Sequence, residues 1–432
     1  MLVATACGSP APTATPEPAA TAGATASARP AASGGGSECP SVRPAAPKGE
    51  TATAKVLAEG TNQAPRVSGV VYPRPQHEGN PWSQWGQGIV LPDGRFLSAI
   101  GDHQGVDGNS YLYVFDPQGG ELTRFSDVAT RLGHMKGQFG YGKVHAQMVQ
   151  PSCDEVIVAT YWGTRKGLKY GGGYTGDHLM SVDTATLQVT DLGVPAPNRG
   201  ITSLGAHGDL VYGEAVDPEG RPGDDNDDTG TFFVFDTQSR KVTYAKDDTR
   251  HIGFRNMAVD ADGRAYLAMK DGGLLRYEAG GELVEHDQRL PDGWLRASTV
   301  PTEDGTVYAV TRQPERYVAI LADGSIDDLG AASGYIASMA LSQDGSEFYV
   351  IPGAHGDSWE NGTPLLAVDV GTGREREVVR LAPLVQKGLG LTPGGTYNIA
   401  VDRATGRIFV GLNAGTTSDE PWGEVVLVTV EP

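Results

Sequence analysis

The sequence predicts an all-β fold, a seven-bladed β-propeller, because one structural unit recurs along the chain from about residue 52 onward. Each unit begins with a short apolar strand, a tight turn and a second apolar strand, and Asp-Gly between such strands is a strong hairpin signal. A third strand and a more polar fourth strand follow, as in the blade of a propeller. The turns that mark the seven units are Pro92–Gly94, Ser152–Asp154, Gly208–Asp209, Asp262–Gly263, Asp304–Gly305, Asp344–Gly345 and Thr405–Gly406.

The composition agrees with this fold class. The 432 residues include 60 glycines without a collagen-like period, which indicates many tight turns. No segment has a sustained helical period, so no helix is expected within the blades. The sequence also lacks a long apolar run of the kind that spans a bilayer.

The seventh unit ends after its third strand, at residues 424–430. A strand from the N-terminal part of the chain, either 54–58 or 67–72, is therefore expected to supply its outer strand. Such a strand closes the ring and removes the open sheet edges. We accordingly expect residues 52–432 to form one seven-bladed domain.

The N-terminal part has a different character. Residues 1–7 end in small residues before Cys7 and match the last part of a bacterial lipoprotein signal, in which Cys7 is lipidated. An unmodified cysteine in a disordered tail is the alternative. Residues 8–51 are rich in Ala, Thr, Pro, Ser and Gly and are expected to form a disordered tether. These features predict an extracytoplasmic lipoprotein of the cell envelope, held at the membrane only by its lipid.

The two remaining cysteines form an even pair. In the oxidising compartment expected here, Cys39 and Cys153 are predicted to form a disulfide that fixes the end of the tether to the folded body. Two buried free thiols are the alternative.

The charge of the chain limits its partners. There are 53 Asp and Glu residues against 34 Lys and Arg residues, which gives a formal net charge of −19. Nucleic-acid binding requires a basic surface, and the sequence has no basic stripe. We expect a monomer that binds no nucleic acid.

The ligand site is expected where the central channel opens. In a propeller, the loops between second and third strands and the links between blades gather on one face, and insertions there are the first candidates for function. Aromatic side chains would stack on a ligand and polar ones would contact it; a channel filled only with water is the alternative. The candidate ligand-binding residues are Trp85, Gln87, His103, Gln147, Trp162, Tyr174, Asn256, Lys270, Arg312, His355 and Trp359.

Two smaller sets of residues predict specific chemistry. His103, His145 and Glu214 come from successive blades and combine imidazole with carboxylate, which suits a divalent cation such as Ca, Mg or Mn. His145, Tyr161 and Arg165 would supply a base, an acid and a carboxylate-neutralising group for β-elimination on a uronic acid. The acidic stretch 224–228 lacks the spacing of a calcium-binding hand, so a solvated loop is the preferred interpretation.

The strand and turn units at 256–266 and 398–409 resemble those of streptogramin lyase-like, gluconolactonase-like and oligogalacturonate lyase-like propellers. The resemblance lies in the repeated alternation of strands and turns and covers the folded body. Two of these groups imply metal-assisted elimination at the axis by histidine and carboxylate residues. Gluconolactonase-like enzymes imply a calcium site, for which Glu214, Asn256 and Asn398 are the candidates.

Together these observations predict a tethered extracytoplasmic propeller that binds a carbohydrate or another small polar ligand at the mouth of its channel. A lyase or hydrolase acting on a polysaccharide or lactone is the enzymatic form of this prediction, and the sequence leaves open whether the protein is an enzyme. The alternative is a non-enzymatic scaffold that binds protein partners through its rim.

Overall fold

The computed structural model describes residues 39, 47–75, 82–164, 166, 168, 173–217, 230–248, 257–269, 271–417 and 422–431. Cys7, Arg165, Asn256 and Lys270 lie outside the described residues. So do the acidic stretch 224–228, the predicted signal remnant 1–7 and most of the predicted tether.

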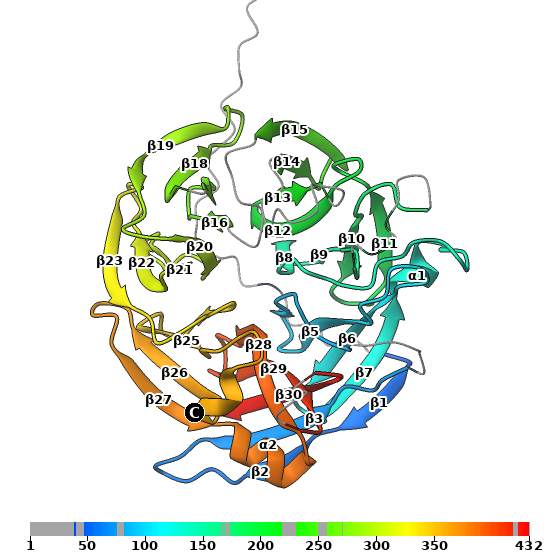
Figure 1. The fold of residues 1–432 in the computed structure, drawn as a ribbon, viewed down its shortest axis with the longest axis vertical. Helices are drawn as coiled ribbons and strands as arrows, with labels where there is room; N and C mark the ends of the chain where they lie inside the picture. Colours follow the sequence, from blue (N-terminus) through cyan, green and yellow to red (C-terminus); the bar gives the residue numbers. More distant parts are fainter. Residues whose placement is uncertain are drawn as a thin grey trace, which may run out of the picture. The chain divides into compact units, whose positions relative to one another are not determined.

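The described strands form seven antiparallel sheets arranged in a ring, with β8, β12, β16, β20 and β28 near the centre of the view (Figure 1). This confirms the predicted seven-bladed β-propeller. From the centre outward, blade one holds β4 (Ile89–Val90), β5 (Phe96–Gly101), β6 (Ser110–Asp116), β7 (Glu121–Asp127) and β1 (Glu50–Thr53). Blade two holds β8 (Val149–Ser152), β9 (Glu155–Ala159), β10 (Leu179–Asp183) and β11 (Val189–Gly193). Blade three holds β12 (Gly200–His207), β13 (Leu210–Val216), β14 (Gly230–Asp236) and β15 (Lys241–Asp248).

The remaining blades follow the same order. Blade four holds β16 (Met257–Val259), β17 (Ala265–Ala268), β18 (Gly273–Tyr277) and β19 (Val284–Arg289); blade five holds β20 (Trp294–Ser298), β21 (Val307–Arg312), β22 (Arg316–Ile320) and β23 (Ile326–Ala331); blade six holds β24 (Ala340–Leu341), β25 (Glu347–Val350), β26 (Pro364–Asp369) and β27 (Glu375–Arg380); and blade seven holds β28 (Thr392–Val401), β29 (Ile408–Gly415), β30 (Glu424–Glu431), β3 (Arg66–Val71) and β2 (Lys55–Ala58).

The N-terminal strand closes the ring as predicted. In blade seven β3 pairs with β30, with Val67 opposite Val430 and Val71 opposite Val426. Strand β2 then pairs with the free side of β3. Of the two candidate segments, the later one therefore supplies the fourth strand and the earlier one a fifth.

Blade one also has a fifth strand, which the sequence pattern did not predict. Strand β1 pairs with β7, and Glu50 lies opposite Arg124 with 3.0 Å between the carboxylate and the guanidinium. Among the described residues the first strand thus begins at Glu50, slightly before the expected boundary, and the polar strand β7 is not the edge of its sheet.

Helix α2 (Ala382–Leu389) lies outside the blade sheets and was not predicted from the sequence pattern. It has Pro383 in its first turn and ends at Gly390, whose φ of 72° is the left-handed conformation that terminates helices. Ala382 and Val385 are buried, and the helix contacts β2, β3 and β28. Eight residues are too few to display a helical period in the sequence. The other helical segments described are α1 (Val128–Arg131) and the 3-10 helix η1 (Ser358–Asn361).

The hydrophobic core lies between neighbouring blades. Phe96 of blade one stacks on Phe409 of blade seven with 4.9 Å between ring centroids, and Phe115 meets the same ring edge-on. The two phenylalanines of blade one and Phe409 are at most 2% exposed. Each blade therefore buries its apolar faces against its two neighbours, which fixes the ring and the position of the strands at its centre.

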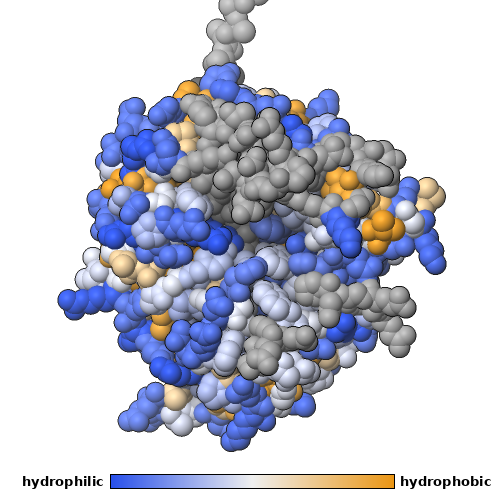
Figure 2. All heavy atoms as spheres, in the orientation of Figure 1, coloured by the Kyte–Doolittle hydropathy of each residue, from blue (hydrophilic) through white to orange (hydrophobic). Residues whose placement is uncertain are grey.

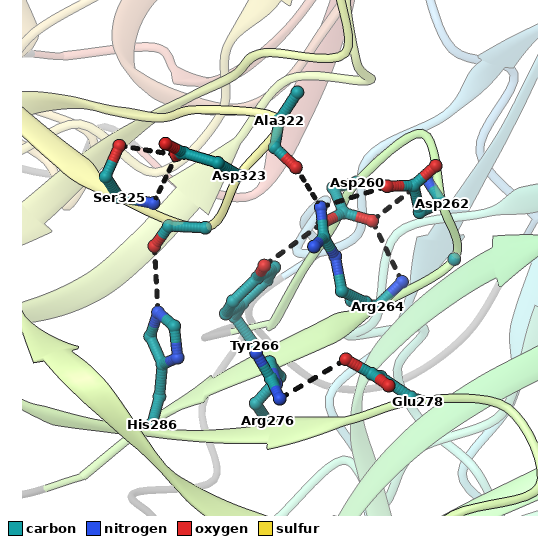
Figure 3. A network of polar contacts seen from close by, with 12 residues as sticks. Asp260, Asp262, Arg264, Tyr266, Arg276, Glu278, His286, Ala322, Asp323 and Ser325 are labelled. Carbon is teal, nitrogen blue, oxygen red and sulfur yellow. Dashed lines mark hydrogen bonds and ion pairs between the residues drawn. The ribbon is translucent and has the colours of Figure 1, made fainter.

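Arginine side chains tie neighbouring blades together on the side of the first turns. Arg264 of blade four bonds Asp260 through Nε at 2.6 Å and donates from Nη2 to the carbonyl of Ala322 in blade five (Figure 3). Arg95 makes the equivalent contact from blade one, bonding Asp93 at 2.6 Å and donating to the carbonyl of Thr184 in blade two at 2.7 Å. We call these two arginines the blade clamps.

A disulfide joins Cys39 to Cys153, which lies in the turn between β8 and β9 of blade two. It holds residue 39 against the folded body. In the part of the chain that the structure describes, no helix is both long and apolar enough to cross a membrane.

Candidate functional site

The first strands of the blades surround a cavity of about 430 Å³ along the axis of the ring. Its size is in the range of small-molecule sites. All seven blades contribute to it, and most of the lining is apolar, including Ile89, Met148, Leu204, Met257, Met339 and Leu341. Among the described residues that line this channel there is no Asp or Glu, although two arginines are present, Arg296 and Arg403.

Two β-bulges shape the upper end of the channel, where the first strands begin. In β20 the register shifts between Leu295 and Ala297, so Arg296 is the extra residue. In β28 the register shifts between Thr396 and Asn398, so Tyr397 is the extra residue. A bulge redirects a side chain and is common beside functional sites.

Aromatic rings gather at this end. The Trp85 ring lies 4.7 Å from that of Tyr397 and 5.8 Å from that of Trp422, which is parallel to it within 2°. Two histidine rings border the same tryptophan, His103 at 5.2 Å and His355 at 5.6 Å. His355 Nδ1 is also 2.7 Å from the hydroxyl oxygen of Tyr397. Four segments from blades one, six and seven thus meet around Trp85.

Three cations surround these rings. Lys143 Nζ lies 4.8 Å from the centre of the Trp85 ring. The Arg312 guanidinium lies 4.3 Å from the Tyr335 ring, and Arg296 donates to the Tyr335 hydroxyl from Nε at 2.8 Å and from Nη2 at 2.6 Å. Cations placed against aromatic rings are held by the ring quadrupoles. We call the aromatic and cationic side chains Trp85, His103, Lys143, Arg296, Arg312, Tyr335, His355, Tyr397 and Trp422 the mouth cluster.

Two buried nitrogen atoms of the mouth cluster have no hydrogen-bond partner among the described residues, Arg296 Nη1 and His103 Nε2. Arg296 is only 5% exposed, so its charge is almost entirely removed from solvent. Buried polar groups nearly always have a partner, and an unsatisfied group is costly. His103 also has a φ of 59°, a left-handed conformation that is unfavourable for non-glycine residues and is found at binding sites.

Burial sets the charges of this cluster. It lowers the pKa of Lys143 to about 8. Burial, with the charge of Lys143 as a second cause, lowers the pKa of His103 to about 2. The pKa of His355 is lowered by burial and then by Arg312, Arg296 and Lys143, while Asp357 opposes the shift. At neutral pH both histidines are therefore neutral, and the positive charge resides on the lysine and the two arginines.

The structure brings several predicted ligand-binding residues together. Trp85, His103, Arg312 and His355 all belong to the mouth cluster. Gln87 and Gln147 line the channel below it, and Gln87 Nε2 donates to the carbonyls of Ile399 and Met339 at 2.8 and 3.2 Å. Trp359 lies half-buried in η1.

Three of the aromatic residues predicted for the site are instead part of the core. Tyr161, Trp162 and Tyr174 are 4%, 3% and 0% exposed, so their rings offer no face on which a sugar could stack. Trp162 stacks on Tyr161 and fills the space beside Gly200, where a Cβ would lie 1.6 Å from the indole ring. The sequence could not separate these rings from surface aromatics because the glycine that admits Trp162 lies in the next blade.

The residues predicted for elimination are described in part. His145 and Tyr161 are adjacent, with 4.8 Å between ring centroids, and His145 Nδ1 lies 3.2 Å from the carbonyl oxygen of Thr202. Arg165, the third member, lies outside the described residues.

The metal ligands predicted from the sequence do not form a cluster. Across the described ranges, no group of three or more His, Cys, Asp or Glu side chains could hold a metal ion. His103 belongs to the mouth cluster, His145 packs on Tyr161, and Glu214 is fully buried within β13. Of the calcium candidates implied by the resemblance, Asn398 accepts from the backbone N–H of Gly88 at 2.8 Å, and Asn256 is not described.

Sequence reasoning missed five members of the mouth cluster, Lys143, Arg296, Tyr335, Tyr397 and Trp422. One signal could have found Arg296. Gln87, Gln147 and Ser298 all line the channel, and the residues two positions earlier are Trp85, His145 and Arg296. If the first strands are aligned so that Gln87, Gln147 and Ser298 occupy equivalent positions, one residue of each blade falls at the upper end of the channel. The bulges add a residue to some blades, which hides the register when single strands are read alone.

Comparisons with known proteins give little beyond the fold. No family model matches the chain, and no curated protein sequence matches it. Among solved structures, the chain is similar to a catalytically inactive variant of virginiamycin B lyase from Staphylococcus aureus with quinupristin. The identity is 10%, the TM-score is 0.46, and the match covers 88% of this chain and 99% of that chain.

Proposed function

We propose that this propeller binds a small organic anion at the upper end of its central channel, with the mouth cluster as the binding site. The observation that carries the proposal is Arg296. Its guanidinium is almost completely buried, and Nη1 has no partner among the described residues although the other two nitrogens bond Tyr335. An anion accepting a hydrogen bond from Nη1 would satisfy this donor and neutralise the buried charge.

The surroundings of Arg296 support an anion rather than a cation. Lys143 and Arg312 add positive charge around the same aromatic rings, and the described channel lining contains no carboxylate. This local excess of positive charge occurs in a chain whose net charge is −19. A carboxylate ligand would place its charge at Arg296 and its less polar body beside the apolar and aromatic side chains around it.

The scaffold alternative has less support. The large hydrophobic side chains that are exposed in the described part of the chain are Val56, Val106, Met135, Val242, Val284 and Val300. They come from different parts of the ring, and the coloured part of the face in Figure 2 is mostly hydrophilic with small separate apolar groups. Protein-binding surfaces are usually marked by larger continuous patches.

Isothermal titration calorimetry with carboxylates and their neutral counterparts tests the proposal. The carboxylates are glucuronate, benzoate and octanoate, and the neutral counterparts are glucose, benzyl alcohol and octanol. We expect at least one carboxylate to bind in preference to its neutral counterpart. The Arg296→Met variant should bind that carboxylate roughly 10- to 100-fold more weakly, since a hydrogen bond to a charged group contributes about 1.5–3 kcal/mol.

The matched control is Arg316→Met. Arg316 also belongs to blade five, but its side chain is 30% exposed and forms an ion pair with Asp328 of the neighbouring outer strand β23. It should leave the affinity unchanged. Equal binding of carboxylates and neutral compounds, or equal binding by wild type and Arg296→Met, would refute the proposal.

The setting of this site is proposed on separate grounds. The disulfide between Cys39 and Cys153 supports the extracytoplasmic location, because disulfides persist in oxidising compartments. Lipidation of Cys7, the divalent cation and the elimination chemistry stay predictions. Palmitate labelling of wild type and Cys7→Ala in cells would test the lipidation. Metal analysis of the purified protein would test the divalent cation, and an absorbance assay for unsaturated uronides would test the elimination chemistry.

A further inference from the structure

The channel below the mouth cluster has its own chemistry. Its lining is formed mostly by aliphatic side chains and methionines, among them Val90, Met148, Val259, Met339 and Val401. Met148 and Met339 are 5% and 1% exposed, and flexible methionine side chains fit apolar ligands of varied shape. The apolar part of this lining favours a ligand body with few hydroxyl groups, since buried hydroxyl groups lose their hydrogen bonds to water.

The channel and the mouth cluster share Arg296 and are in contact through Ala337. Arg296 lines the channel and bonds Tyr335 of the mouth cluster. Ala337 likewise lines the channel and packs in one apolar cluster with Trp85, Tyr397 and Trp422. The buried Arg296 therefore marks the upper end of an apolar space of about 430 Å³.

The opposite end of the channel, where the first strands end, combines apolar side chains with the exposed Arg403. It is bordered by Val300 and Pro301, in the connection between β20 and β21. Val300 is 60% exposed, one of the few large hydrophobic side chains exposed in the described part of the chain. A ligand body leaving the channel on this side would meet the exposed Val300 side chain.

From this combination we infer that the ligand is an amphiphilic anion, with its anionic group at Arg296 and its apolar chain along the channel toward Val300. The inference rests on the proposed function and narrows it to a ligand class, carboxylates with an unbranched or weakly branched apolar chain. The buried arginine favours an anionic group by charge complementarity, and the described lining holds no carboxylate that would repel one. The aliphatic side chains of the lining favour a ligand with an apolar chain.

A chain-length series tests this inference. Hexanoate, octanoate and decanoate are titrated into the full-length protein below their micelle concentrations, with octanol and octyltrimethylammonium as neutral and cationic probes. Each added methylene that is buried contributes about 0.8 kcal/mol, so the affinity should rise roughly fourfold per methylene until the channel is full. The carboxylates should bind more tightly than either octyl probe.

Two substitutions separate the chain from the anionic group. Ala340 lines the channel from β24. In Ala340→Phe the affinity should rise less with the chain length of the carboxylate, while hexanoate still binds. Ala185→Phe, at an exposed turn of blade two, makes the same change away from the channel and should leave the series unaffected. Thermal melting of both variants shows whether the fold is intact, and Ala340→Leu provides a smaller obstruction if the phenylalanine unfolds the protein.

The outcomes distinguish the two proposals. Carboxylate binding that depends on Arg296 but not on chain length would overturn the amphiphile inference and leave the proposed function in place. Binding that is insensitive to Arg296→Met would refute both. Loss of affinity in Arg403→Met instead would place the anionic group at the other arginine of the channel lining and overturn the assigned orientation.

Discussion

At the scale of single residues, Lys143 is the charge of the mouth cluster that titrates near neutral pH. Burial lowers its pKa to about 8, so it is mostly protonated at pH 7 and mostly neutral at pH 9. The groups that face it, His103 and His355, have lowered pKa values and stay neutral over this range. We therefore expect anion affinity to fall by up to roughly tenfold between pH 7 and pH 9, measured by calorimetry at constant ionic strength.

The conservative variant separates this titration from a general effect of pH. Lys143→Arg keeps its charge throughout the range because the guanidinium pKa lies above 12. Its anion affinity should be nearly constant between pH 7 and pH 9. A pH profile in Lys143→Arg as steep as that of the wild type would assign the titration to another group.

The same lysine should also reduce stability. A folded-state pKa below the unfolded value means that the unfolded chain binds more protons, so Lys143 destabilises the fold at neutral pH and stops doing so above pH 10. We expect Lys143→Met to raise the melting temperature at pH 7 by about 1–3 °C while weakening anion binding. No rise in melting temperature would indicate that the lysine is well solvated.

At the scale of the elements, the blade clamps hold neighbouring sheets in position. Arg95 and Asp93 have side chains only 3% and 6% exposed, and Arg95 donates to Thr184 of the next blade. Removing one partner of a buried ion pair leaves the other charge uncompensated, which costs about 3–5 kcal/mol. We expect Arg95→Gln to lower the free energy of unfolding by about 3 kcal/mol in urea denaturation.

An exposed ion pair provides the comparison for that clamp. Arg380 pairs with Glu377 at the surface of blade six, with side chains 58% and 42% exposed. Arg380→Gln should change stability by less than about 1 kcal/mol, as is usual for surface ion pairs. Similar losses in both variants would show that the burial of Arg95 is not what makes its contact important.

The elements also explain how much of the site could be predicted. The hairpin turns after the first strands predicted the blades, and they place Trp85, His103, Arg312 and His355 at one end of the channel because those residues lie at strand ends. Arg296 and Tyr397 were missed because each is the extra residue of a bulge, and a bulge depends on pairing with another strand. The burial of Tyr161, Trp162 and Tyr174 depends on contacts between blades, which a repeat pattern does not display.

At the scale of the whole molecule, repetition made the fold predictable, while its irregular parts were not. Seven similar units with an incomplete last unit required a closing strand, and β3 supplies it. The added strands β1 and β2 and helix α2 lie at the outside of the ring, where the repeat imposes no constraint. Their presence follows from the particular residues at the N-terminal end and after β27, and among the described blades only blade one, with α1 after β7, also has a helix after its fourth strand.

The closing strand leads to a prediction for the ring as one cooperative unit. Val67 of β3 is fully buried between β30 and the core of blade seven, whereas Val56 of β2 is 44% exposed. Both residues belong to the same N-terminal strand pair, so aspartate can be introduced at each with the same change in chemistry. Val67→Asp buries an unpaired charge and should lower the free energy of unfolding by more than about 4 kcal/mol; Val56→Asp should change it by less than about 0.5 kcal/mol.

If β3 closes the ring, urea unfolding of Val67→Asp followed by tryptophan fluorescence and by far-ultraviolet circular dichroism should give one coincident transition at lower urea. Separate transitions, with blades one to six unfolding at the wild-type midpoint, would mean that the ring does not depend on its closing strand.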